Sequence, residues 1–128
     1  MQYIAIFNGN PTANARDGAE VSQGDVLSNP VKASVSAGSD AVVKCAVRCA
    51  SGLSCDSASI DVITKANGSY TIGSDYAKVS ASASGPWTNT ISIADVSDVN
   101  SIFYVKLTGL PVAGSYTAYG LRLSGVVE

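Results

Sequence analysis

The chain has 128 residues, and its 10 acidic and 8 basic residues give a formal net charge of −2. This length fits one domain, residues 1–128, around a single hydrophobic core. Charged residues make up 14% of the chain, well below the usual share, and the few Lys and Arg residues form no cluster typical of nucleic-acid binding. The chain has no histidine, which excludes Ser-His and Cys-His nucleophilic mechanisms and most zinc sites. We therefore expect a protein that is not an enzyme and uses no cofactor or metal.

The N-terminal segment, Met1 to Asn8, has no basic region before its short apolar stretch, and that stretch is shorter than the hydrophobic region of a signal peptide. No run of about 18 apolar residues occurs, as a membrane-spanning helix would need. We therefore expect synthesis in a cytoplasm without a signal peptide, and no membrane insertion.

Apolar and polar residues alternate with a period of two along much of the chain, whereas helical periodicity is hard to find. Such alternation is typical of strands that bury one face and expose the other to solvent. In residues 43–49, for example, Lys44, Ala46 and Arg48 belong to the solvent-facing set. The same pattern predicts strands at residues 3–7, 31–37, 60–62, 77–84, 90–93, 103–107 and 119–124, and a ninth segment near 20–22.

Clusters of Gly, Pro, Asn, Asp and Ser separate these strands and predict turns. They lie at residues 8–11, 17–18, 24–25, 28–30, 38–40, 67–68, 85–86 and 111–114. Short strands with turns about every 8 to 15 residues favour an all-β fold, an antiparallel β-sandwich of about eight or nine strands, over βαβ units. A closed barrel is the structural alternative. Residues 80–85 are rich in Ser and Ala but keep the alternation, so we expect a weak edge strand there rather than a linker.

Three cysteines, an odd number, lie between residues 45 and 55, and without a leader this argues against an extracellular disulfide framework. Cys45 lies on the apolar face of its strand, so we expect a buried free thiol. Cys49 and Cys55 flank a short segment typical of a hairpin tip, and they either form a disulfide or remain reduced. A zinc site on the three thiolates would need a further ligand such as Asp56, and we expect no metal there.

Asp95 and Asp98 lie in a segment rich in Asp, Ser and Asn between two predicted strands, residues 94–100. We expect a turn there, whose side chains bond to backbone amides where the chain crosses between the sheets. The alternatives are a pair of catalytic carboxyl groups or a weak calcium site. The sequence Asn67-Gly68-Ser69 predicts a hairpin turn, with a glycosylation site as the alternative.

Trp87 is the one tryptophan of the chain and follows a Gly-Pro pair. An exposed indole flanked by Tyr70, Tyr76 or Tyr119 could stack on a sugar ring and so make a ligand contact. The alternative, which we favour, is that Trp87 closes one end of the sandwich. The solvent-facing strand positions carry many Ser, Ala, Thr and Gly residues instead of Lys and Glu, and such neutral surfaces suit packing against other subunits, including a homo-oligomer.

Residues 91–107, with the sequence ISIADVSDVNSIFYVKL, resemble the E strand, corner and F strand of immunoglobulin-like domains, where an aspartate-bearing turn precedes a Tyr-containing strand. The chain departs from antibody-type domains in several respects. It has no Trp in the third strand and no Cys in the strand that matches F, and Tyr104 is displaced from the usual tyrosine-corner spacing relative to Asp98. The resemblance therefore concerns the architecture.

A second resemblance rests on turn residues and one presumed hairpin: FNGNPT at 7–12, DG at 17–18, VSQGD at 21–25, NP at 29–30 and RCASGLSC at 48–55, together with residues 91–107. These segments resemble small structural modules of tailed bacteriophages and prophages, in which immunoglobulin-like sandwiches decorate capsids or tails, or extend tail proteins, and some bind host-surface carbohydrate weakly.

The phage resemblance implies a non-enzymatic virion protein, a head decoration or tail-associated module that contacts other virion proteins or further copies of itself. Its alternative implication is a carbohydrate-binding or host-surface adhesion module. We accordingly expect the protein in the virion, assembled inside the host bacterium, with no nucleic acid as partner.

Overall fold

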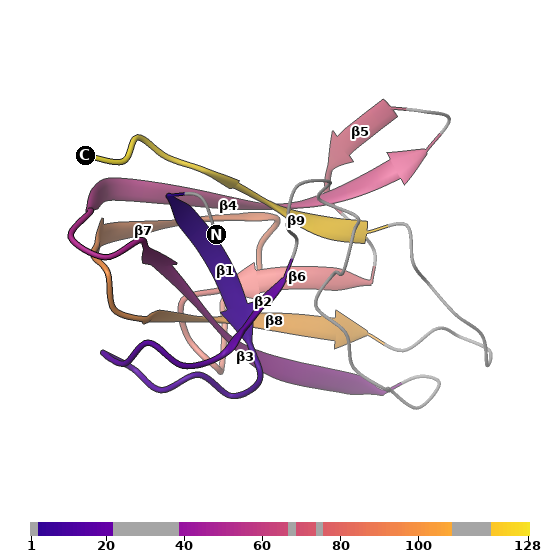
Figure 1. The fold of residues 1–128 in the computed structure, drawn as a ribbon. Coiled ribbons are helices and arrows are strands. Elements are labelled where there is room, and N and C mark those ends of the chain that lie inside the picture. The colour runs from indigo at the N-terminus through magenta and orange to yellow at the C-terminus, as the bar shows by residue number, and fades with distance from the viewer. Residues whose placement is uncertain (1–2, 22–38, 67–68, 74–75, 109–118) are drawn as a thin grey trace.

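The structure, a computed structural model, describes residues 3–21, 39–66, 69–73, 76–108 and 119–128. These residues form nine strands and no helix (Figure 1). The strands are β1 (Ile4–Asn8), β2 (Ala19–Val21), β3 (Asp40–Cys49), β4 (Cys55–Ala66), β5 (Ser69–Ile72), β6 (Ala77–Ser80), β7 (Thr90–Val96), β8 (Ser101–Thr108) and β9 (Tyr119–Ser124). The predicted all-β fold is confirmed.

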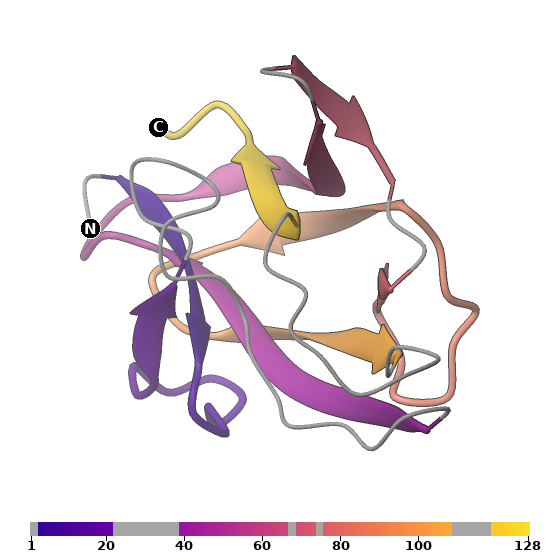
Figure 2. The same ribbon diagram turned by 90° about the vertical axis from the view of Figure 1, so that its right-hand side faces the viewer.

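The strands form two antiparallel sheets, as the β-sandwich prediction requires (Figures 1 and 2). The first sheet has the order β2-β1-β3-β8-β6, and the second is built around β4, which pairs with β5, β7 and β9. Within the second sheet, β7 and β9 lie on opposite sides of β4, because Asp61 is paired both with Thr90 of β7 and with Arg122 of β9.

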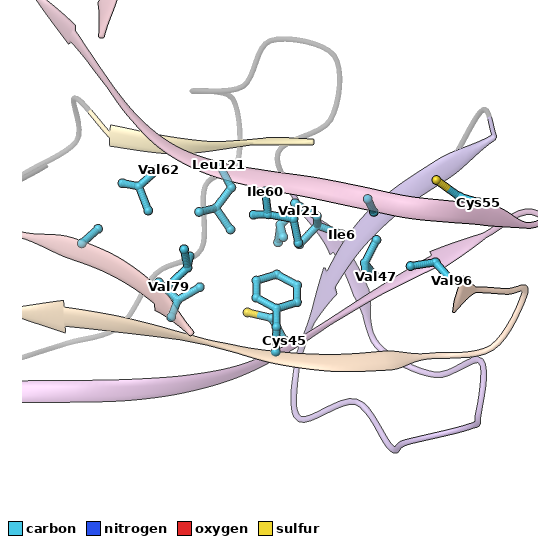
Figure 3. Close-up of a cluster of buried hydrophobic side chains, with 14 of the residues drawn as sticks. Ile6, Val21, Cys45, Val47, Cys55, Ile60, Val62, Val79, Val96 and Leu121 are labelled. Carbon is cyan, nitrogen blue, oxygen red and sulfur yellow. The ribbon is translucent and has the colours of Figure 1, made fainter. Parts of the chain in front are cut away.

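Apolar side chains from both sheets fill the space between them (Figure 3). Phe103 of β8 and Ile60 of β4 are the largest of the fully buried side chains. Cys45 of β3 belongs to the same cluster, and burial raises the pKa of its thiol to about 12. Cys45 is therefore a protonated side chain that packs as a small apolar group, as expected.

The outer side of the first sheet is partly covered by the connection between β1 and β2. Ala46, which the alternation assigned to solvent, is 0% exposed, and its partner across the strands, Phe7, is also buried. A Cβ added at Gly18 would lie 3.1 Å from the Cβ of Phe7 and 3.4 Å from that of Pro11, itself a fully buried residue. The prediction for Ala46 was wrong because residues 9–18 cover this part of the sheet.

β6 ends at Ser80, so the expected strand through residue 84 is wrong beyond that point. Residues 81–84 bend and turn instead. The hydroxyl of Ser80 accepts a hydrogen bond from the amide of Ser82 at 3.1 Å, and the carbonyl of Ser82 accepts one from the amide of Gly85, also at 3.1 Å. Serine side chains that bond to nearby backbone groups compete with the ladder of a strand, which explains the early end.

Two further differences concern the second sheet. β4 extends well beyond the predicted residues 60–62, and β5 was not predicted. The Asn67-Gly68 pair lies outside the described residues, but Ala66 pairs with Ser69 across it, as a hairpin requires. The predicted strand at 31–37 and the predicted turns at 24–25, 28–30 and 111–114 also lie outside the described residues.

Replacing Ile60 with Val removes one carbon from a fully buried side chain, and we expect it to lower the free energy of unfolding by about 0.5–1.5 kcal/mol. The matched control is Ile72→Val in β5, where the side chain is 56% exposed and the same change should cost no more than about 0.5 kcal/mol. Urea unfolding followed by circular dichroism measures both values. Equal losses in the two variants would contradict the placement of Ile60 between the sheets.

Candidate functional site

Asn100, just before β8, ties the corner between β7 and β8 to the β1–β2 connection, and it is 2% exposed. Its side-chain nitrogen donates to the carbonyl oxygen of Thr12 at 3.0 Å and to Oδ1 of Asp17 at 2.9 Å. Its side-chain oxygen accepts a hydrogen bond from Arg48 Nη1 at 2.7 Å, and its backbone amide donates to the carbonyl of Ala15 at 2.8 Å. These bonds satisfy the buried side-chain amide of Asn100 and hold residues 9–18, which we call the cover, over β1 and β3.

Arg48 of β3 links the apolar and polar parts of this cover. Its guanidinium carbon lies 3.6 Å from the centre of the Phe7 ring, and its Nη1 also donates to the carbonyl oxygen of Asp17 at 2.8 Å. The carboxylate of Asp17 accepts hydrogen bonds from the amide and the hydroxyl of Thr12, both at 2.8 Å, and these bonds lower its pKa. Arg48 and Asp17 thus use their polar groups in hydrogen bonds that connect β3, the β1–β2 connection and Asn100.

Asp98 lies in the same corner, and its Oδ2 accepts hydrogen bonds from the amide of Gly52 at 3.0 Å and from Arg16 Nη2 at 2.6 Å. The bond from Gly52 contributes most to the lowered pKa of Asp98, and the charge of Arg16 lowers it further. The expected turn is confirmed for residues 97–100, where side chains bond to backbone amides between the sheets, whereas residues 94–96 belong to β7. Asp95 is exposed in β7 with a φ of 55°. Among the described residues, no group of three Asp, Glu, Cys or His side chains could hold a metal ion.

Cys49 and Cys55 are free, buried thiols in the structure, which corresponds to the reduced one of the two alternatives for this pair. The segment between them is not a hairpin tip, because β3 belongs to the first sheet and β4 to the second. Burial raises the pKa of the Cys49 thiol, and the neighbouring Cys55 and Asp98 raise it further. The Cys55 thiol donates to the carbonyl oxygen of Ser57 at 3.2 Å. A protonated, buried thiol such as Cys49 is a poor nucleophile, so we interpret it as a packing residue.

Trp87 lies on the segment that leads from β6 in the first sheet to β7 in the second. Val79 of β6 exchanges two backbone hydrogen bonds of 2.9 Å with Thr88, and Val62 of β4 donates to the carbonyl of Asn89 at 2.8 Å. The indole is half-buried, and the ammonium of Lys106 lies 5.9 Å from the centre of its ring. Trp87 is not among the described side chains that pack on the main core, and its role in closing one end of the sandwich stays a prediction.

The tyrosines that we considered with Trp87 lie on other elements. Tyr76 precedes β6, whereas Tyr70 belongs to β5 and Tyr119 to β9, both in the second sheet. The side chains of Tyr70 and Tyr119 lie outside the described part of the structure. An aromatic platform of all four residues therefore stays a prediction.

Five small side chains form an exposed surface on the outer side of the second sheet. Ser59 of β4 is opposite Ser92 of β7 and Ser124 of β9, and Ser57 is opposite Ala94. The hydroxyl groups of Ser57 and Ser92 share a hydrogen bond of 2.9 Å. Ser59 is half-buried, and the other four residues are exposed. We call this set the serine face: Ser57, Ser59, Ser92, Ala94 and Ser124.

Asp61 lies next to the serine face and is 7% exposed. Its carboxylate accepts hydrogen bonds from Arg122 Nη2 at 2.8 Å and from the Thr90 hydroxyl at 2.7 Å. Burial by itself would raise the pKa of Asp61, but the hydrogen bonds from Arg122 and Thr90, with the charge of Arg122, outweigh it and lower the pKa. The charges beside the serine face thus neutralise each other.

Three lysines gather on the outer side of the first sheet. Lys78 of β6 is directly opposite Lys106 of β8, and Val42 of β3 is opposite Lys106 on the other side. Lys44 of β3 is opposite Tyr104 of β8. Because alternate and directly opposite positions share one side of a sheet, these residues form one surface. We call it the lysine face: Val42, Lys44, Lys78, Tyr104 and Lys106.

Sequence reasoning placed Trp87 among the candidates and missed the lysine face. Each of its lysines occupies a polar position of a predicted strand, which is a detectable signal. Their grouping depends on β8 lying between β3 and β6 in the sheet, which the order of residues along the chain does not reveal.

Comparisons with known proteins found no matching family model, no matching curated protein and no matching solved structure. In the described ranges, no helix is long and apolar enough to cross a lipid bilayer. The function is therefore inferred from the surfaces of the chain itself.

Asn100→Ala removes the side chain that joins Thr12, Asp17 and Arg48, and we expect the free energy of unfolding to fall by about 1–3 kcal/mol. Asn100→Asp keeps the shape but places a carboxylate against that of Asp17, so at neutral pH it should destabilise the protein at least as much. Thermal melts of the two variants test this. If both melt within error of the wild type, the network does not hold the cover in place.

Acid should weaken the protein partly through Asp61. Because its folded pKa is lowered below the ordinary 3.8, the ion pair with Arg122 stabilises the fold fully above that pH. As the pH falls through 3.8 toward the lower folded pKa, the unfolded chain takes up the proton first and the stabilisation is lost.

We expect Asp61→Asn to lose less stability than the wild type between about pH 5 and pH 2.5. Ser59→Ala, on the same side of β4, is the control and should follow the wild type. Urea unfolding at stepped pH gives the comparison. An identical acid-induced loss in Asp61→Asn and in the wild type would show that this carboxylate adds nothing to the pH dependence.

Proposed function

We propose that the protein is a non-enzymatic structural protein of a tailed bacteriophage or prophage. In this proposal, its immunoglobulin-like sandwich attaches to the head or tail through protein contacts, with other virion proteins or further copies of itself. The observation that carries the proposal is the serine face, an exposed surface of small side chains that spans β7, β4 and β9. The likeness of the turn residues to phage modules supports the virion setting.

The chemistry of the serine face suits a lasting contact between proteins. Ser and Ala lose little rotamer freedom when a partner covers them, so ordering them costs little. The hydroxyl groups of Ser57 and Ser92 already bond to each other, and Asp61 is already paired with Arg122. Covering this surface therefore leaves no unpaired charge from that ion pair, and an unpaired charge would be the largest penalty of burial.

Carbohydrate binding at Trp87 is the second candidate function. The observation in its favour is that the half-buried indole lies outside the main core, which leaves part of the ring accessible. A sugar stacks on a ring face, however, and the ammonium of Lys106 lies over the ring of Trp87. Protein contacts are therefore the better supported function.

Ala94→Arg places a long cationic side chain on the serine face, and we expect it to reduce attachment to phage particles by about tenfold or more, because a buried unpaired charge is costly. The matched control is Ala83→Arg, at an exposed turn position after β6, which should attach as the wild type does. Tagged chains are supplied to cells that assemble the particles, and mass spectrometry of gradient-purified particles gives the amount bound.

Circular dichroism melts confirm that both variants are folded. Absence of the wild-type chain from the particles would overturn the proposed function. Equal attachment of Ala94→Arg and the wild type would show that the serine face is not the contact surface.

A further inference from the structure

Positive charge is concentrated on the lysine face although the chain as a whole is slightly acidic. Three of the 8 basic residues, Lys44, Lys78 and Lys106, lie on this one surface. Lys78 and Lys106 are directly opposite each other on neighbouring strands. Like charges in this position destabilise a sheet, so the pair is unfavourable for the isolated fold.

Among the described residues, the charges of the lysine face are only partly neutralised. Lys106 Nζ is 3.3 Å from Asp40 Oδ2, in an ion pair whose side chains are 31% and 44% exposed. Lys78 Nζ donates at 2.5 Å to Oδ1 of Asn89, a neutral amide. In the described part of the chain, no carboxylate forms an ion pair with Lys44 or Lys78. Counting only the groups that the structure describes, the surface therefore has an excess of positive charge.

The remaining residues of the lysine face favour a protein as its partner. Val42 is 48% exposed, and Tyr104 is half-buried beside Lys44. An exposed apolar side chain and a partly exposed aromatic one among charges are typical of surfaces that bind proteins. A glycan would use the ring of Trp87, but Lys106 already lies over it.

Resting on the proposed function, we infer that the lysine face docks on an acidic protein surface of the same phage particle. Carboxylates of that partner neutralise Lys44, Lys78 and Lys106 and so relieve the repulsion between Lys78 and Lys106. Complementary charges also speed the encounter and favour one orientation of the bound chain. In this arrangement the two sheets have different roles, with small side chains on one outer surface and charge on the other.

The inference is tested with a triple variant, Lys44→Gln/Lys78→Gln/Lys106→Gln. Purified particles that lack this chain are titrated with the wild-type or variant protein, and a glutamate-rich peptide of about twenty residues serves as a defined probe. We expect the triple variant to bind both at least about tenfold more weakly, because up to three ion pairs are lost. Raising the salt from about 50 to 300 mM should weaken wild-type binding more than variant binding.

Single variants supply the matched control. Lys78→Gln should weaken binding to the particles, whereas Lys65→Gln, in β4 of the second sheet, should leave it unchanged. The thermal melt of Lys78→Gln should equal or exceed that of the wild type, because this substitution removes a like-charge pair, and melts of the other variants check that they are folded. If a folded lysine variant binds the particles more weakly than the wild type, the loss is due to the substituted surface and not to unfolding.

The outcomes separate this inference from the function on which it rests. If the triple variant binds particles as the wild type does, the lysine face is not the docking surface, and the proposed virion role stands. If the triple variant loses binding only to heparin or duplex DNA and still binds particles as the wild type does, the partner of the lysine face is another polyanion, and the inference is overturned. If the wild-type chain does not bind particles at all, the proposed function fails as well.

Discussion

The packing of apolar side chains between the two sheets determines which side chains lie on the outer surfaces of both sheets. Phe103 of the first sheet and Ile60 of the second are both fully buried between the sheets. Each strand that contributes such a side chain places its neighbouring residues on the outer side of its sheet. A shift of one residue in any of them would exchange the two sides. The packing of the core thus fixes which residues form the lysine face and the serine face. A change in strand register that altered either face would also disrupt the core.

A second set of contacts decides how much of the outer surface is available. The network around Asn100 fixes residues 9–18 over β1 and β3, where Phe7 and Ala46 are buried beneath them. Arg48, Asp17 and Asp98 are engaged in this cover through hydrogen bonds. Among the described contacts, this network lies at the end of the first sheet away from the lysine face, whose three lysines are half-buried.

The sequence was sufficient for the fold class because alternation is a local property. Residues 43–49 and 103–107 were assigned to strands correctly, and the turn that contains Asp98 was found from its composition. Contacts between distant segments were not accessible in this way. The residues next to Ala46 in the sequence do not indicate that residues 9–18 lie over it. The serines after Ser80 keep the alternation, but the hydroxyl of Ser80 bonds to the amide of Ser82 where the strand ends. The segment between Cys49 and Cys55 has the composition of a hairpin tip but connects two different sheets.

The backbone bonds between Val79 and Thr88 have a consequence for how copies of this chain can associate. They occupy the outer edge of β6 at Val79, and the strand at the other end of that sheet, β2, is only three residues long. An edge that is short or already occupied is a poor template for adding a foreign strand. Adding further strands at either end of this sheet, and with it open-ended growth into ribbons, is therefore disfavoured.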